Sequence, residues 1–214
     1  MSIHTFGSII YNKRKKNTIH TFGDSHSVFG WKNCRNVESH HIGAILCYSF
    51  GQEKLNRCDI SNFDLKYNDS VVFCFGEIDC RCHIHKHVTD EKSYKMIIDE
   101  IVYNYTQAIK MNIDHCKIKL KNVCIYNVVP PIQKHNTNEN IEYPFIGSDE
   151  ERKKYVLYFN KCLKKECEKN KWFFFDVYNS YVDKNGFLNK KFSDGNVHIK
   201  DGRFLNQVIN NYLL

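Results

Sequence analysis

Residues 18–27 read Thr-Ile-His-Thr-Phe-Gly-Asp-Ser-His-Ser. The first six residues alternate in character and end in Gly23, and Asp24 and Ser25 follow directly. The alternation over Thr18 to Gly23 predicts a β-strand. Gly23 permits a tight turn after the strand, and a helix is expected beyond it. In an open parallel sheet, ligands bind beyond the carboxyl ends of the strands. The stretch therefore predicts an α/β fold with Ser25 at its ligand-binding edge.

Four further segments have the composition of strands. The run Val71-Val72-Phe73-Cys74-Phe75 is apolar throughout, as is typical of a central parallel strand covered on both faces. The other three are Gly43 to Ser49, Asn122 to Val129, which Pro130-Pro131 ends, and Trp172 to Val177.

Helical patterns lie between these strands. Apolar residues at helical spacing predict a long helix over residues 94–109 and a last one over 204–213. The sequence Ser148-Asp149-Glu150-Glu151 is a capping box, and it predicts that a helix begins there. Its inner face is expected to hold Val156, Phe159, Leu163 and Cys167. This alternation of strands and helices favours a parallel sheet with helices on both faces.

Composition agrees with one folded domain over residues 18–214, preceded by a basic extension over 1–17. The chain has 214 residues and is 42% hydrophobic, which is ample for one sizeable core. Residues 13–16 supply four of the seven net positive charges, so the rest of the chain carries only three. That balance argues against a nucleic-acid partner. Residues 130–147 form the longest expected loop.

The compartment is expected to be the cytoplasm. We find no apolar run of about 20 residues, and therefore expect no membrane span and no membrane partner. The basic N-terminal cluster is followed by no apolar segment of a secretory signal. Ten cysteines are scattered through strand-like and helix-like segments, so we expect free thiols rather than disulfides.

The residues of a serine hydrolase occur in plausible loops. Ser25 needs a base within hydrogen-bond reach and a group that orients the base, and Asp194-Gly195-Asn196-Val197-His198 offers both near the C-terminus. The pentapeptide Ile-His-Thr-Phe-Gly also occurs at residues 3–7, but Ser8 after it is followed by no comparable motif. Ser25 is the expected nucleophile, and its alternative role is that of a helix cap.

These motifs resemble those of the SGNH/GDSL-type hydrolases. Residues 23–27 resemble the first block of that family, Gly76-Glu77-Ile78-Asp79 stands at the third, and residues 194–198 resemble the last. The resemblance covers residues 18–214 and implies a three-layer α/β/α sandwich with a mostly parallel five-stranded sheet, similar to flavodoxin. It further implies Ser25 as nucleophile, His198 as base and Asp194 as the orienting acid. The variant Gly-Glu-Ile-Asp-Cys-Arg resembles uncharacterised members from large DNA viruses.

Two departures from the family pattern bear on catalysis. The third-block asparagine, an oxyanion donor in the family, is Ile78 here, and Arg81 is the nearest replacement. Loss of such a donor typically costs about 10²–10³ in rate. Asp194 and His198 are four residues apart rather than three, and Gly195 could absorb the extra residue. In the alternative, a backbone carbonyl orients His198 and the site is a dyad.

The remaining site residues are assigned from the same resemblance. The oxyanion hole is expected to use the N–H groups of Ser25 and Gly43, with Gly51 and Gly30 as weaker choices. Five residues beside the catalytic blocks are candidates for substrate binding, with a structural salt-bridge set as the alternative for the last three: Asp24, His26, Glu77, Asp79 and Arg81.

The crowded stretch Cys80-Arg81-Cys82-His83-Ile84-His85-Lys86-His87 contains zinc-binding residue types. Structural zinc sites normally combine ligand pairs from two separated segments, however. We therefore expect a loop that lines one wall of the active site, with no metal and no other cofactor. Adventitious binding of nickel or zinc by this stretch is compatible with that expectation.

The sequence thus favours a serine esterase that acts on a small acyl ester. By resemblance, the substrate is a small molecule or an acylated carbohydrate. One alternative is a sugar O- or N-acyltransferase with the same triad. A second, prompted by Ile78, is a non-catalytic carbohydrate-binding module on a decayed esterase fold.

Overall fold

The protein is built on a five-stranded parallel sheet. The computed structural model describes residues 17–138 and 141–214. Hydrogen bonding gives the strand order β2-β1-β3-β4-β5, and every pair is parallel. This is the flavodoxin-like order, in which the chain reverses direction across the sheet beside β1. The strands are β1 (Ile19–Gly23), β2 (Val37–His41), β3 (Ser70–Cys74), β4 (Asn122–Tyr126) and β5 (Phe173–Phe175).

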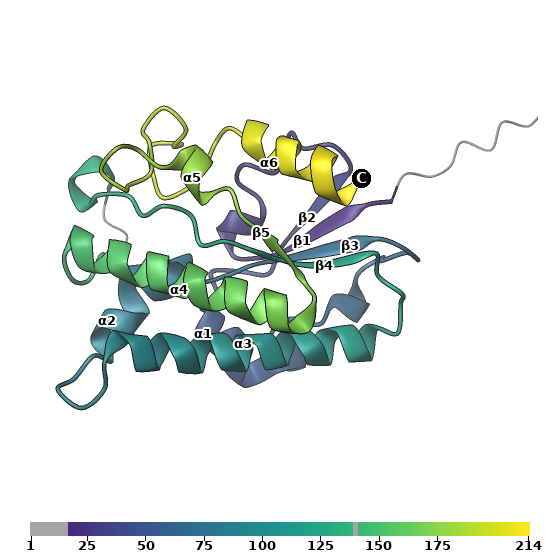
Figure 1. Cartoon of the computed structure of the whole chain (residues 1–214), viewed down its shortest axis with the longest axis horizontal. Coiled ribbons are helices and arrows are strands. Elements are labelled where there is room, and N and C mark those ends of the chain that lie inside the picture. Colours follow the sequence, from purple (N-terminus) through teal and green to yellow (C-terminus); the bar gives the residue numbers. More distant parts are fainter. Residues whose placement is uncertain (1–16, 139–140) are drawn as a thin grey trace, which may run out of the picture.

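Helices cover both faces of the sheet, so the predicted three-layer sandwich is confirmed (Figure 1). The layer below the sheet in Figure 1 contains α1 (Cys47–Glu53), α2 (Ile84–Lys86), α3 (Tyr94–Cys116) and α4 (Asp149–Asn170). The layer above it contains α5 (Tyr178–Tyr181) and α6 (Arg203–Val208), and a wider π-type turn, Ile209–Leu213, continues α6. Short helical segments of other kinds are Ser25–Ser27, Lys54–Asn56, Ile60–Asn62, Asp79–His83 and Lys134–Asn136.

Each face of the sheet has its own apolar core. Side chains alternate between the faces along each strand, so Phe22 and Phe73 belong to the core under α1, α3 and α4. Val72 and Phe175 belong to the core under α6, together with Trp31. The continuous apolar run of β3 is thereby explained, because both of its faces are covered.

The long helices begin where the sequence predicts. The Ser148 hydroxyl accepts a hydrogen bond from the Glu151 N–H at 3.2 Å, and the Glu151 carboxylate accepts one from the Ser148 N–H at 2.7 Å. The predicted capping box of α4 is therefore confirmed. The four residues predicted for its inner face are all buried. The helix ends at Asn170, and the next residue, Lys171, adopts a left-handed conformation with φ 58°.

Two predicted elements are wrong. The strand expected at 43–49 is a loop followed by α1, and the real second strand is β2, at residues 37–41. The segment expected as a loop at 80–87 is helical over residues 79–86. Burial of Cys80, Cys82 and Ile84 against the helical layer stabilises that conformation.

Other predictions concern the termini and the thiols. All but residue 17 of the predicted basic extension lies outside the described residues, and so does Ser8. The ten cysteines are all free, as expected, and nine of them are buried. Within the described ranges, no helix combines the length and apolar character needed to cross a bilayer.

Gly23 at the end of β1 lets the backbones of β1 and β3 approach closely. A Cβ atom at this position would lie 2.1 Å from the Cys74 carbonyl oxygen, which is backbone and cannot rotate away. We therefore expect Gly23→Ala to lower the free energy of unfolding by about 3 kcal/mol or more, measured by chemical denaturation.

Gly195→Ala is the matched control for that substitution. Gly195 has φ +93°, but no atom lies within 4 Å of the added Cβ. Gly195→Ala should therefore lower the free energy of unfolding only through backbone strain, by about 1–2 kcal/mol. Equal costs at the two positions would contradict the predicted clash.

Candidate active site

Ser25 begins a short 3₁₀ turn directly after β1. Asp24 caps this turn, because its carboxylate accepts a hydrogen bond from the His26 N–H at 2.8 Å. The Ser27 hydroxyl is placed to donate to the carbonyl oxygens of Asp24, at 2.8 Å, and His40, at 3.0 Å. The Ser27 carbonyl oxygen also accepts from the Thr21 hydroxyl of β1 at 2.6 Å, so the turn is hydrogen-bonded to both β1 and β2 and holds Ser25 at the carboxyl edge of the sheet.

The structure brings the three predicted triad residues into one hydrogen-bonded series. The Nε2 atom of His198 lies 2.8 Å from the Ser25 Oγ, across 173 residues of sequence. The Nδ1 atom of the same ring lies 2.8 Å from the Asp194 Oδ2. With Nδ1 protonated, His198 presents the lone pair of Nε2 to the serine hydroxyl. This is the arrangement in which an imidazole can accept the serine proton.

The extra residue between Asp194 and His198 is taken up in a tight turn. Gly195 adopts φ +93°, and the Asp194 N–H donates to the His198 carbonyl oxygen at 3.1 Å. The Asp194 Oδ1 accepts from the Asn196 N–H at 2.8 Å, which leaves Oδ2 for the imidazole. The four-residue spacing is thus compatible with a direct contact between carboxylate and imidazole.

A second histidine lies against the first. The His26 ring centroid is 5.0 Å from that of His198, and its Nδ1 lies 3.0 Å from the Asp24 Oδ1. Its Nε2 lies 3.3 Å from the Val197 carbonyl oxygen. Asp24 is fully buried, and its Oδ2 has no hydrogen-bond partner among the described residues. The buried pair of His26 and Asp24 therefore stabilises the turn that carries Ser25.

This pair affects the protonation of the candidate base. Burial lowers the pKa of His198 below 6.5, and the neighbouring His26 lowers it further, although Asp194 acts in the opposite direction. Burial alone would also lower the pKa of His26, but Asp24, Glu77 and the Val197 carbonyl together raise it. His198 is consequently neutral, the form required of a general base, at and somewhat below neutral pH.

Glu77 and Arg81 form a buried ion pair one turn apart, with the Arg81 Nε 3.0 Å from the Glu77 Oε1. The Arg81 guanidinium also donates to the Tyr143 carbonyl oxygen at 2.9 Å, and it lies 5.5 Å from the Phe145 ring centroid. Arg81 therefore joins the helical segment 79–86 to the segment that follows residue 140. Its hydrogen bonds do not include Ser25.

Asp79 supports α1. Its carboxylate is fully buried and accepts hydrogen bonds from the N–H groups of Cys47, at 2.6 Å, and Tyr48, at 3.0 Å. Negative charge at a helix N-terminus is favourable, and burial nevertheless raises the pKa of Asp79 to about 7. The contacts of Asp79 are those of a helix cap.

The predicted oxyanion donors lie beside β1. The Ile42 N–H donates to the Gly23 carbonyl oxygen at 2.8 Å, which brings the Gly43 loop to the end of the nucleophile strand. Among the described residues, no hydrogen bond is donated by the N–H of Ser25 or of Gly43. Ile78, by contrast, is only 3% exposed and packs in the interior. The position of the family's asparagine is therefore occupied by an apolar side chain that packs in the core.

One residue of the site carries no signal in the sequence. The Phe29 ring stacks on the His198 imidazole, with ring centroids 4.1 Å apart and an interplanar angle of 15°. Phe29 is 38% exposed, so it covers one side of the candidate base while remaining open to solvent. Its position depends on the loop between Ser27 and β2, which no motif describes.

The stretch 80–87 does not bring a metal-binding set together. The thiols of Cys80 and Cys82 are buried, and the Cys82 Sγ lies 3.3 Å from the Ile78 carbonyl oxygen. The rings of His83 and His87 are adjacent, with centroids 4.5 Å apart. Over the described residues, no convergent group of three potential ligands includes any member of this stretch.

No protein-family model and no curated protein matches this chain. Solved structures do match. A Streptococcus pneumonia protein whose name refers to platelet activating factor has a TM-score of 0.66 and 14% identity, over 95% of this chain and 87% of its own. A GDSL-like lipase from Bacteroides thetaiotaomicron has a TM-score of 0.58 and 15% identity, over 91% and 86%.

A carbohydrate acetylesterase from Sinorhizobium meliloti has a TM-score of 0.55 and 13% identity, over 91% of this chain and 97% of its own. The chain therefore has the α/β fold of GDSL-type esterases and lipases, as expected. At these identities the likeness concerns the fold. The resemblance of the Gly-Glu-Ile-Asp-Cys-Arg motif to viral proteins stays a prediction.

Proposed function

We propose that this protein is a serine esterase that removes a small acyl group through Ser25, His198 and Asp194. The observation that carries the proposal is the hydrogen-bonded series of these residues, with both distances at 2.8 Å. A helix cap or a surface histidine would require neither contact. The fold, shared with esterases and lipases, supports the same reaction class.

The mechanism follows from the geometry. His198 Nε2 takes the proton of the Ser25 hydroxyl as Oγ attacks the ester carbonyl carbon, and Asp194 stabilises the imidazolium that forms. The N–H groups of Ser25 and Gly43 stabilise the negative charge on the carbonyl oxygen. His198 then protonates the departing alcohol, leaving an acyl-enzyme. Water, deprotonated by His198, releases the carboxylic acid and restores Ser25.

Burial divides the five proposed substrate-binding residues into two groups. Asp24 and Asp79 are fully buried, so we assign them to holding the nucleophile turn and α1. His26, Glu77 and Arg81 retain 6–8% exposure and remain candidates for contact with the substrate. Because Glu77 and Arg81 already satisfy one another, a substrate contact there would be made by the edge of the ion pair.

A carbohydrate acetyl ester is the proposed substrate. The acetylesterase that shares the fold acts on carbohydrates, and Phe29 offers a partly exposed aromatic ring beside the base, against which a sugar ring can pack. Acyl transfer to a sugar would use the same residues. It differs only in whether an acceptor or water reaches the acyl-enzyme.

Hydrolysis of p-nitrophenyl esters of increasing chain length, together with acetate release from an acetylated sugar, tests this proposal. We expect the acetyl ester to give the highest kcat/KM and the acetylated sugar to yield free acetate. Acetyl groups recovered on an added sugar instead of as acetate would show a transferase. Absence of turnover on every ester would support the binding-module alternative.

A further inference from the structure

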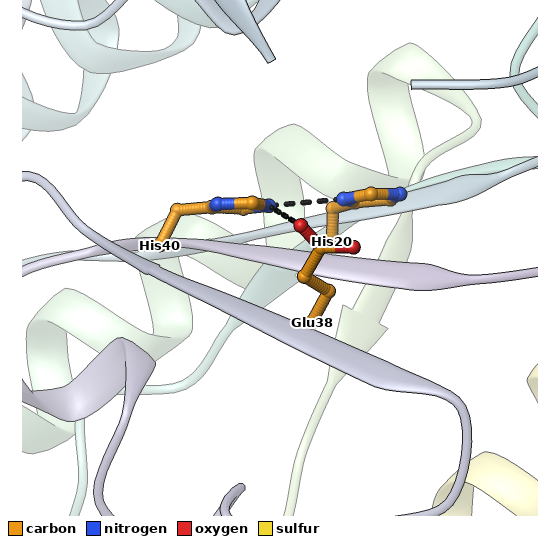
Figure 2. Close-up of side chains that lie close together, drawn as sticks. All are labelled: His20, Glu38 and His40. Carbon is orange, nitrogen blue, oxygen red and sulfur yellow. Dashed lines mark hydrogen bonds and ion pairs between the residues drawn. The ribbon is translucent and has the colours of Figure 1, made fainter. Parts of the chain in front are cut away.

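Two histidines and a glutamate converge on β1 and the edge strand β2. His20 lies in β1 and pairs in register with Glu38 of β2, and His40 follows Glu38 by two residues. All three therefore project from the same face of the sheet. Figure 2 shows the two imidazole rings nearly edge to edge, with the Glu38 carboxylate pointing toward the His40 ring.

The facing atoms of these residues are metal-ligand atoms. The His20 Nδ1 and His40 Nε2 are 2.9 Å apart, and the Glu38 Oε1 is 3.9 Å from the His40 Nε2. One ligand atom from each residue lies within 4.8 Å of the others. In a tetrahedral zinc site with Zn–N bonds of 2.0–2.1 Å, two nitrogens are about 3.3 Å apart. The imidazoles would need to separate by only about 0.4 Å.

Buried groups hold His20 in the orientation that a ligand needs. Its Nε2 lies 3.2 Å from the Asp69 Oδ2, and both side chains are almost fully buried. Asp69 is fixed in turn by the N–H groups of Lys66, at 2.7 Å, and Thr18, at 2.8 Å. A carboxylate on the far nitrogen keeps the proton there and leaves the lone pair of Nδ1 for a metal. This is the usual support of a zinc-binding histidine. The proton of the hydrogen bond between the two rings is then on the His40 Nε2, and metal binding moves it to the His40 Nδ1.

The other two residues allow an ion to enter and to be held. The His40 ring lies against Phe22 and Phe63, with centroids 4.7 and 4.5 Å away, so its position is set by packing. The Glu38 side chain is 59% exposed and free to turn inward.

A pocket of about 410 Å³ opens beside this cluster, and its lining includes His20, Glu38 and Asp69 but not His40. A proposed metal site needs such an entry path.

We propose that His20 Nδ1, His40 Nε2 and Glu38 form a binding site for a divalent transition-metal ion of the zinc type, with Asp69 as the positioning residue for His20. The site is separate from Ser25 and does not depend on the esterase activity. Bound metal would join the edge strand β2 to β1. Because the His40 carbonyl oxygen accepts from the Ser27 hydroxyl, that connection reaches the turn that carries Ser25.

The test is a titration of the untagged, chelator-treated full chain with Zn²⁺ by calorimetry and with Co²⁺ by absorption spectroscopy. We expect one equivalent to bind, with a Co²⁺ spectrum that shows nitrogen and oxygen ligands and no thiolate charge-transfer band. Glu38→Gln and His40→Gln should each weaken binding at least about tenfold. Glu38→Gln changes an exposed residue, so it remains informative if His40→Gln fails to fold.

The matched control is the double variant His83→Ala/His87→Ala, which removes the adjacent histidines of the stretch 80–87. Its Zn²⁺ affinity should equal that of the wild type. Undiminished binding in folded His40→Gln and in Glu38→Gln, or binding lost in the control variant, would overturn the proposal. If the wild type binds no Zn²⁺ at about 100 µM, the proposal is also rejected, and the cluster is only a hydrogen-bonded histidine pair.

Discussion

Replacing Ser25 by alanine is expected to abolish ester hydrolysis, lowering kcat by about 10⁴–10⁶. The Ser25 Oγ is the hydroxyl that lies 2.8 Å from the His198 Nε2, and alanine removes it without adding bulk at the edge of the sheet. A fluorophosphonate probe, which forms a covalent bond only with an activated serine, should label the wild type and not the variant. Turnover of p-nitrophenyl acetate should fall in parallel.

The chain provides a matched control for this prediction. Ser8 follows the same pentapeptide, Ile-His-Thr-Phe-Gly, as does Asp24-Ser25, but without the residues that complete the motif. Ser8→Ala should therefore retain both labelling and turnover. Labelling that persists in Ser25→Ala would place the nucleophile elsewhere and remove the basis of the proposed mechanism.

The sequence predicted the central strands because burial on both faces leaves a clear pattern. Residues 71–75 are apolar throughout, and β3 lies where they predict it. The edge strand β2 reads Val-Glu-Ser-His-His, has a partner on one side only and is partly exposed along its length. Its stability comes from pairing with β1 and from tertiary contacts, so local composition could not reveal it.

The same distinction applies to the site. Residue 25 could be predicted because its motif follows the carboxyl end of a parallel strand, and residues 194 and 198 because their motif resembles the last block of the SGNH/GDSL-type hydrolases. The ion pair of Arg81 with Glu77 was open to prediction as a salt bridge, but its contact with the Tyr143 carbonyl was not, because that residue lies in a segment whose path no pattern specifies. The helical form of residues 79–86 was likewise missed, since it depends on burial of Cys80 and Ile84 rather than on helix propensity.

Removal of the proposed base should lower kcat nearly as much as removal of the proposed nucleophile. We expect His198→Ala to lower kcat by about 10⁴–10⁶, since no other group is hydrogen-bonded to the Ser25 hydroxyl among the described residues. Asp194→Asn should lower it by roughly 10⁴, because the amide no longer fixes the tautomer of the imidazole. An unchanged rate in Asp194→Asn would favour the dyad, in which a backbone carbonyl orients His198.

The pH dependence gives a sharper test, because two neighbours act on His198 in opposite directions. The proposed mechanism requires neutral His198, so kcat/KM should fall as the pH drops through the pKa of this residue in the free enzyme. Burial and the neighbouring His26 lower that pKa, and the wild-type midpoint is therefore expected below pH 6.5. His26 has a raised pKa, so it is positively charged in the pH range where His198 titrates.

Removing that charge should make His198 easier to protonate. In His26→Gln the midpoint should therefore move to higher pH, toward 6.5, while Asp194→Asn should move it to lower pH because a favourable negative charge is lost. Rates are compared with far-ultraviolet circular dichroism at each pH, which separates titration from unfolding. If both variants shift in the same direction, the charges of His26 and Asp194 do not act on His198 as their contacts require. Opposite shifts would identify His198 as the titrating base and His26 as the residue that tunes it.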